Sequence, residues 1–201
     1  MVKLYHFLLF FDIIIIGGYM NPILTVLLTI IALVSLIGIL YIITYNNLQV
    51  NKIKINESES IIDELLRKKY DLLNLIKSLV IEKTEIPEKA FDEYKKIKDL
   101  NISSFDFERK LTEYNNLVNK IRMDYETLEN DSRFKKYYDE MYDINEKLEA
   151  AKSFYNKYTS ILNKIIKKFP SNIVAFIHHI KVQAFFDGKD MFDEDIKDFK
   201  L

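Results

Sequence analysis

The chain of 201 residues has no cysteine and no tryptophan, and only four glycines and three prolines. The lack of cysteine excludes disulfides, thiolate metal sites and thiol catalysis. So few glycines and prolines leave little material for tight turns, whereas the abundant Lys, Glu, Leu and Ile favour helices. The formal net charge is −1. Because nucleic-acid binding needs a basic face, we expect no nucleic-acid partner.

A long uncharged run lies near the N-terminus. It extends from Ile23 to Ile43, which matches the roughly 20 residues that a helix needs to cross a bilayer. We expect a single transmembrane helix over 22–44 that continues without a break to about Lys83. Lys52 and Lys54 follow the run, and the positive-inside rule then places the C-terminal part in the cytoplasm and the short N-terminus outside a cell membrane.

The first 21 residues allow three interpretations. The apolar segment Phe7–Ile16 contains Asp12 and is too short to span a bilayer. It fits a signal-peptide core, which would need a cleavage site, or a re-entrant or interfacial segment. We favour a third hypothesis, in which translation starts at Met20, because codons for the preceding Gly-Gly-Tyr can spell a ribosome-binding site.

Two later stretches carry the alternating three-and-four spacing of an apolar seam, which is typical of helical bundles and coiled coils. Asp131 or Ser132 can cap the second stretch, so the two helices should form an antiparallel hairpin. The first seam is Phe107, Leu111, Tyr114, Val118, Ile121, Tyr125 and Leu128, and the second is Phe134, Tyr137, Met141, Ile144, Leu148, Ala151, Tyr155, Tyr158, Leu162, Ile165 and Phe169.

Further helices are expected on either side of this hairpin. The segment after the uncharged run has one broad apolar face made by Leu48, Ile55, Ile62, Leu65, Leu66, Leu73, Ile76 and Val80. A shorter helix should follow Pro87 and bury Phe91, Tyr94, Ile97 and Leu100.

Caps and breakers set the remaining boundaries. Ser104 is placed to cap the helix of the first seam. Pro170 should end the second seam at Phe169, and Ser171 or Asn172 should cap the apolar segment Ile173–Ile177. We therefore predict an all-α protein: an elongated antiparallel bundle of about four helices over 45–186, followed by an acidic tail over 187–201.

Several segments resemble the LemA family of bacterial membrane proteins. They cover about half the chain and are Tyr45-Asn46-x-Leu48, Ile62-Asp63, Leu66–Leu73, Ala150–Asn156, Phe169–Asn172, Ala175 and Phe185-Phe186. The resemblance implies a short extracytoplasmic N-terminus, one span and a cytoplasmic helical bundle, in a family without an established enzymatic activity. The chain departs from the family pattern at Glu59, at Asn74-Leu75 and at Phe176–His179, where the family has tryptophan, Pro-Asn and glycines. It therefore resembles a divergent member.

Two groups of residues are candidates for an interaction site. Arg67, Lys68 and Lys69 form the densest basic cluster, which suits an anion, a protein partner or simply a solvated face. An upright helix would hold this cluster roughly 36 Å from the end of the uncharged run, too far for the bilayer charge to act on it. Phe185 and Phe186 are the second group, and they either form an exposed apolar patch or fold back onto the bundle.

No pattern points to catalysis, a cofactor or a metal. His178 and His179 are adjacent and diverge by about 100° on a helix, and the segment Asp187–Asp190 has the wrong register for a calcium loop. Phosphate loops, nucleophile elbows and paired carboxylates are absent from the sequence.

We therefore expect a membrane-anchored, non-enzymatic scaffold or adaptor that binds protein partners, with a second copy of the chain as one candidate. The alternative is a bundle that acts on the bilayer through its C-terminal segment, and a helical-bundle enzyme is the remote one.

Overall fold

The computed structural model describes residues 21–97 and 102–187. This part of the chain is helical and contains no strand, which confirms the all-α prediction. Its elements are α2 (Pro22–Lys83), the 3₁₀ helix η1 (Glu88–Tyr94), α3 (Ser104–Asp124), α4 (Glu126–Glu129), α5 (Ser132–Lys167) and α6 (Ser171–Ile177). The predictions for residues 1–20, for Leu100 and for the tail beyond Asp187 lie outside the described residues.

Helix α2 contains both the uncharged run and the first helix of the bundle, as expected. It starts with Pro22, which tolerates the first helical position, and the Asn21 side chain accepts a hydrogen bond from Ile23 N at 3.0 Å. Within the described residues, α2 has the one segment that is long and apolar enough to cross a membrane, and the protein buries none of it. An apolar helix without protein cover fits a lipid surrounding.

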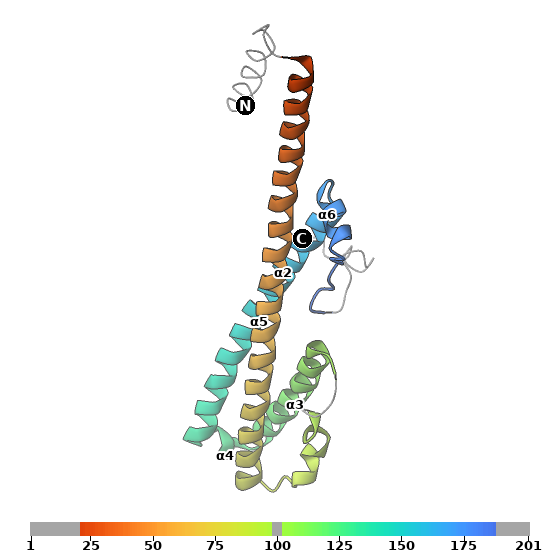
Figure 1. Ribbon diagram of the computed structural model, residues 1–201. Helices are drawn as coiled ribbons and strands as arrows, with labels where there is room; N and C mark the ends of the chain where they lie inside the picture. The colour runs from red at the N-terminus through yellow and green to blue at the C-terminus, as the bar shows by residue number, and fades with distance from the viewer. Residues whose placement is uncertain (1–20, 98–101, 188–201) are drawn as a thin grey trace, which may run out of the picture. The chain divides into compact units, whose positions relative to one another are not determined.

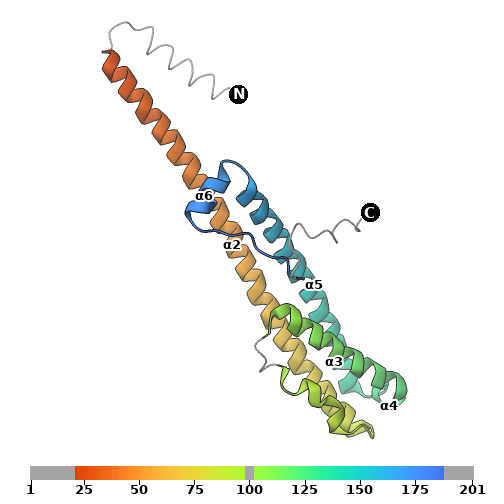
Figure 2. The ribbon, with the colours of Figure 1, turned by 90° about the vertical axis from the view of Figure 1, so that its right-hand side faces the viewer.

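The chain divides into two compact units, Met1–Asn47 and Leu48–Leu201. In the second unit three long helices run side by side: the last part of α2, α3 and α5 (Figure 1, Figure 2). Contacts fix their directions. Tyr138 bonds Asn119 and Lys152 bonds Glu108, so α5 and α3 are antiparallel, as expected.

Helix α3 runs in the same direction as α2. The Tyr114 hydroxyl donates to Leu73 O at 3.4 Å, and the Ser104 hydroxyl ten residues earlier bonds Asp63, ten residues before Leu73. The chain can return to the start of α3 only through the connection over residues 84–103, which contains η1. The predicted helix after Pro87 is this 3₁₀ helix. Buried Phe91, half-buried Tyr94 and buried Ile97 follow one another at steps of three, which suits its three residues per turn.

The observed N-terminal capping residue matches the prediction at α5 and differs from it at α3 and α6. Asp131 caps α5, with its carboxylate accepting from Arg133 N at 2.8 Å and Phe134 N at 3.3 Å. Helix α3 is capped by Ser103 instead of Ser104, because Ser104 is already helical. Helix α6 starts at Ser171 without a side-chain cap, so the predicted cap at Ser171 or Asn172 is wrong.

The core follows the predicted seams through most of the bundle. All eight apolar residues predicted for α2 are buried, and so are Leu111, Tyr114, Val118 and Ile121 on α3. On α5 the seam holds from Phe134 to Leu162, but Phe169 is 73% exposed. Tyr114 is the largest fully buried side chain, and it stacks on Tyr94 with ring centroids 4.5 Å apart.

Candidate functional site

The three adjacent basic residues of α2 do not form one surface, because successive helical residues point about 100° apart. Arg67 and Lys68 are exposed, and Lys68 pairs with Glu64 one turn earlier. Lys69 is only 5% exposed and interacts electrostatically with Glu108 of α3. The structure therefore divides the predicted basic cluster into a solvated pair and a buried lysine.

Lys69, Glu108 and Lys152 form a group that we call the buried charges, with the exposed Glu149 at its edge. Lys152 donates to Glu108 Oε1 at 2.7 Å and pairs with Glu149 Oε1 at 2.5 Å. Burial lowers the pKa of Lys69, although Glu108 and Glu149 act in the opposite direction. Burial also acts to lower the pKa of Lys152, but its hydrogen bonds to the two carboxylates raise it overall. The group therefore ties α3 and α5 together with its carboxylates already paired.

Phe186 lies beside these charges and not on an exposed patch. Its ring is edge-on to Phe105 at 6.2 Å and to Tyr155 at 6.3 Å, and Lys152 Nζ lies 5.7 Å from its centroid. Both Phe185 and Phe186 are half-buried. Phe186 thus packs against the bundle and lines the same hollow as Glu108 and Lys152.

Side chains of α5 hold the segment that leads to Phe186, Ile180–Phe186, which we call the return segment. Asn163 is 1% exposed and makes two hydrogen bonds to the backbone of Gln183, at 2.8 Å and 2.9 Å. Asn156 accepts from Phe186 N at 2.8 Å. The Tyr155 hydroxyl donates to Ala184 O at 3.3 Å. The return segment is not helical, so these side chains supply the partners that its backbone lacks.

A tight cap joins α6 to the return segment. His179 has a left-handed backbone with φ 52° and donates to Phe176 O at 3.1 Å, while Ile180 N donates to Ala175 O at 2.9 Å. This pair of bonds is the Schellman motif, whose left-handed position usually holds glycine. Both histidines are exposed, and groups of three or more metal-ligating residues are absent from the described part of the chain.

The outer face of α6 is apolar. Val174 and Ala175 are buried, whereas Phe176 is 80% exposed and Ile173 and Ile177 about half exposed. We call the exposed set Phe169, Ile173, Phe176, Ile177 and Val182 the apolar tip. A helix on a water-facing surface normally turns a polar face outward. An exposed apolar set of this kind is a candidate binding surface.

A second apolar surface runs along α2. Val50, Ile53, Ile61 and Leu75 are each about half exposed. At 100° per residue their side chains project within a stripe about 80° wide. Four charged residues share this stripe: Lys68 and Glu64, which pair with each other, and the exposed Glu57 and Asp71. We call these four aliphatic residues the α2 stripe.

The model of the LemA family matches residues 58–197, well over half of the chain. The chain belongs to the LemA family. No curated protein and no solved structure matches it. The match to the LemA family includes the buried charges, α6 and the return segment. Together with the uncovered apolar run of α2, it indicates a membrane-anchored protein.

Sequence reasoning missed two features of this LemA-family chain. The buried charges lie beside the seams, since Glu108 follows Phe107 and Lys152 follows Ala151, and residues that flank a seam are where interhelical ion pairs form. The exposure of the apolar tip was not predicted, because Phe169 continues the apolar spacing of α5. The spacing of apolar residues does not show whether a neighbouring helix covers them.

Proposed function

We propose that the protein is a membrane-anchored, non-enzymatic scaffold whose bundle binds a helix of a protein partner along the α2 stripe. The observation that carries this is the stripe itself. Four half-exposed aliphatic residues at helical spacing lie on one face of the bundle's longest helix. A partner helix that covers them completes a packing arrangement of the kind that joins α2, α3 and α5.

The anchor supports this function through concentration. A bundle held at the membrane meets other membrane-bound or surface-bound proteins at an effective concentration set by its tether, so a modest apolar surface suffices for binding. Lysines near the start of the bundle favour the cytoplasmic side for it. Lys52 and Lys54 follow the span, and Lys164 and Lys167 of α5, with Lys168 directly after it, lie at the same end of the bundle.

The non-enzymatic assignment draws on the buried charges. They include Lys69, whose pKa is lowered by burial, and a lysine of lowered pKa is a candidate base or nucleophile. Both neighbouring carboxylates are paired with Lys152, and Phe186 lines the same hollow. This arrangement suits a structural role better than turnover of a substrate.

Photo-crosslinking of the full chain in native membranes tests the proposal. A crosslinking amino acid at Leu75 should give one defined adduct. The double substitution Ile53→Glu with Ile61→Glu should weaken that adduct at least about tenfold, the equivalent of 1.4 kcal/mol. Because both residues are half exposed, the bundle should keep its melting temperature.

Glutamate at Met123 and Tyr142 provides the matched control, since both residues are exposed and apolar but lie off the α2 stripe. An adduct of equal strength in the stripe variant and the control contradicts the proposal. An adduct of twice the chain mass identifies a second copy as the partner.

The alternative function, in which the bundle acts on the bilayer itself, has a separate observation in its favour, the apolar tip on α6.

A further inference from the structure

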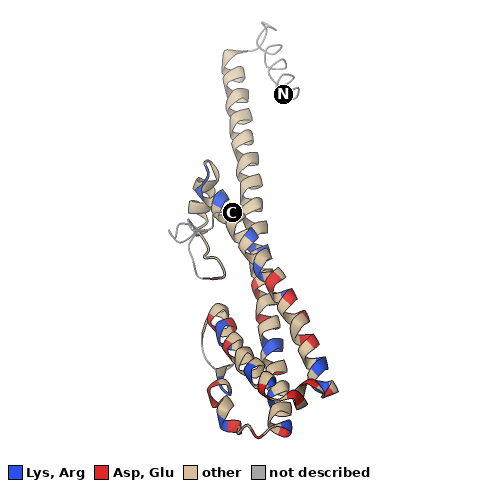
Figure 3. Ribbon diagram, turned by 180° about the vertical axis from the view of Figure 1, so that it is seen from behind, with Lys and Arg blue, Asp and Glu red and all other residues tan. Residues whose placement is uncertain are grey.

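Lysines gather at the end of the bundle that carries the apolar tip. From Ala150 to Phe186 the chain has no aspartate or glutamate and six lysines: Lys152, Lys157, Lys164, Lys167, Lys168 and Lys181. The facing part of α2 adds Lys52 and Lys54, with no acid before Glu57. In the second unit, the acids gather toward the opposite end, and the end with α6 shows basic residues only (Figure 3). A chain of net charge −1 thus has one strongly basic end.

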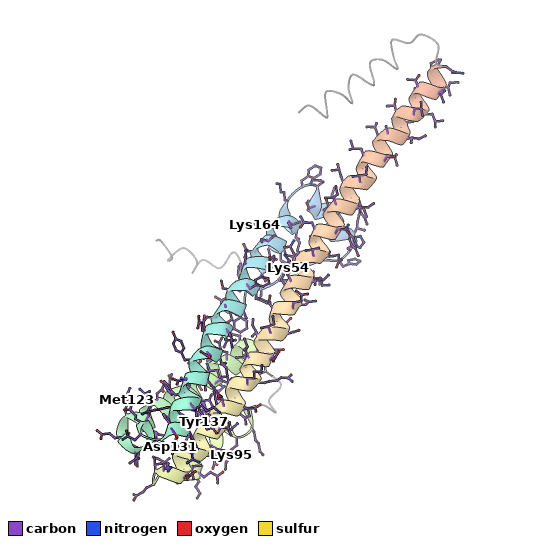
Figure 4. All side chains as sticks on the ribbon, turned by 90° about the vertical axis from the view of Figure 1, so that its left-hand side faces the viewer. Lys54, Lys95, Met123, Asp131, Tyr137 and Lys164 are labelled. Carbon is purple, nitrogen blue, oxygen red and sulfur yellow. The ribbon has the colours of Figure 1, made fainter. Side chains whose placement is uncertain are left out.

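This basic end is also the end where the chain enters the bundle from the span. The Lys54 ammonium donates to the Tyr158 hydroxyl at 3.0 Å, which sets the two helices level there, and Lys54 and Lys164 lie at the same end of the bundle (Figure 4). From Tyr158, α5 continues nine residues to Lys167, about 14 Å. From Lys54 back to Leu48, α2 covers about 9 Å. The end of α5, from which the chain continues into α6, therefore lies about 5 Å beyond Leu48, the first residue of the bundle, measured along the helices.

The covalent chain limits how far this end lies from the bilayer. Leu48 follows Ile43, the last residue of the uncharged run, by five residues. Five residues span at most about 18 Å in any conformation. The limit holds for every angle between the span and the bundle. The apolar tip is thus tethered within reach of the headgroup region in which the span ends.

The tip is held in a fixed position and does not hang loosely. Val174 and Ala175 anchor α6 from within, the Schellman cap at His179 closes its end, and Asn163 fixes the return segment behind it. Large apolar side chains that a fold keeps exposed, surrounded by lysines without acids, have the composition of interfacial membrane anchors. An anionic leaflet supplies the charge that complements these lysines.

We propose that the apolar tip and its lysines form a second membrane contact, which docks on the anionic surface of the bilayer that the chain's own span crosses. Phe169 and Phe176 enter the region between headgroups and acyl chains. Lys164, Lys168 and Lys181 pair with lipid phosphates. The inference requires the membrane anchor but not a partner on the α2 stripe, so the two proposals fail independently.

The absence of cysteine makes the test direct. Full-length Phe176→Cys carries one environment-sensitive fluorophore and is reconstituted into phosphatidylcholine vesicles with or without phosphatidylglycerol. Nitroxide-labelled lipids should remove at least about half of the emission at position 176 when the lipid is anionic. Tyr142→Cys is the matched control, since Tyr142 is 70% exposed on α5 and does not belong to the apolar tip, so its label should respond to aqueous iodide instead. Ile173→Cys repeats the measurement if Phe176→Cys perturbs the fold.

Charge reversal at Lys164, Lys168 and Lys181 to glutamate should abolish the dependence on phosphatidylglycerol while the helical circular dichroism stays unchanged. Equal iodide quenching at positions 176 and 142 in both vesicle types overturns the proposal. A label at 176 that is shielded from both quenchers also overturns it, because protein then covers the tip. Quenching by the labelled lipids that is equal with and without phosphatidylglycerol, and equal in the charge-reversed variant, contradicts the pairing of the lysines with lipid phosphates.

Discussion

Asn163→Asp tests whether the return segment is fixed by the side chain of Asn163. The amide group donates through Nδ2 to Gln183 O at 2.8 Å and accepts through Oδ1 from Gln183 N at 2.9 Å. Aspartate has nearly the same shape and keeps the acceptor. It replaces the donor with a second oxygen, which faces the carbonyl of Gln183 when the carboxyl is ionised.

The cost follows from burial. Asn163 is 1% exposed, and a buried polar group that loses its partner costs about 1–3 kcal/mol, more when it is charged. We expect the variant to lose about 2–4 kcal/mol at pH 7. If the return segment detaches before the bundle unfolds, the loss in the free energy of unfolding cannot exceed the free energy with which the segment binds the bundle. A global loss of this size lowers the melting temperature by roughly 5–12 °C.

The same change predicts a pH dependence with a definite sign. Burial and the facing carbonyl raise the folded-state pKa of the new carboxyl above its unfolded value of about 3.9. The protonated form can donate to Gln183 O and restore the lost bond. The variant should therefore match the wild type below about pH 4 and lose stability as the pH rises through the folded pKa.

Hydrogen exchange of the full chain in detergent measures the effect locally, and thermal unfolding followed by circular dichroism measures it globally. Exchange at the amide of Gln183 should accelerate at pH 7 and slow again in acid. Asn172→Asp introduces the same charge on exposed Asn172 of α6 and corrects for the general effect of pH. Unchanged exchange at Gln183, or a deficit that persists in acid, would refute the reasoning.

Three further predictions concern packing, the α6 cap and the α5 cap. Leu148→Asp should lower the free energy of unfolding by roughly 3–5 kcal/mol, because Leu148 is 1% exposed, whereas Tyr142→Asp on the exposed side of α5 should stay within about 0.5 kcal/mol in the same urea titration. His179→Gly should raise the free energy of unfolding by roughly 1 kcal/mol, since the left-handed backbone strains any residue with a side chain, and a lower melting temperature would contradict the Schellman assignment. Asp131→Ala should lower the melting temperature at neutral pH, but because Arg133 holds the pKa of Asp131 at about 2, the stabilisation is lost as the pH falls toward that value and the two proteins should then melt alike.

The part of the fold that the sequence predicts is the part governed by local spacing. The seam residues of α2 from Ile62 to Val80, and those of α3 from Leu111 to Ile121, are buried where the three helices pack together. Asp131 is found at the start of α5 because a capping carboxylate acts within four residues. The choice between Ser103 and Ser104 escapes this logic, since both can cap and the contact of Ser104 with Asp63 decides between them.

The candidate site was harder to predict because its contacts are distant in sequence. Three adjacent basic residues suggest a surface cluster, yet the register of α2 buries Lys69 while Lys68 stays in solvent. The apolar spacing of α5 likewise continues to Phe169, where no helix covers it. The spacing of apolar residues shows that they lie on one face of a helix. It does not show whether protein, water or lipid contacts that face.

The polar interior near Leu48 has a structural cause. Helix α3 begins at the level of Asp63, so it does not lie beside α2 and α5 between Leu48 and about that level, where the return segment packs against α5 instead. A non-helical segment brings unpaired backbone groups, which an apolar wall would leave unsatisfied. Buried or half-buried asparagines at positions 156 and 163 lie two turns apart on α5 and bond that backbone. Polar residues in this part of the core are therefore required by the return segment, and their spacing of seven is the signal by which a sequence could reveal it.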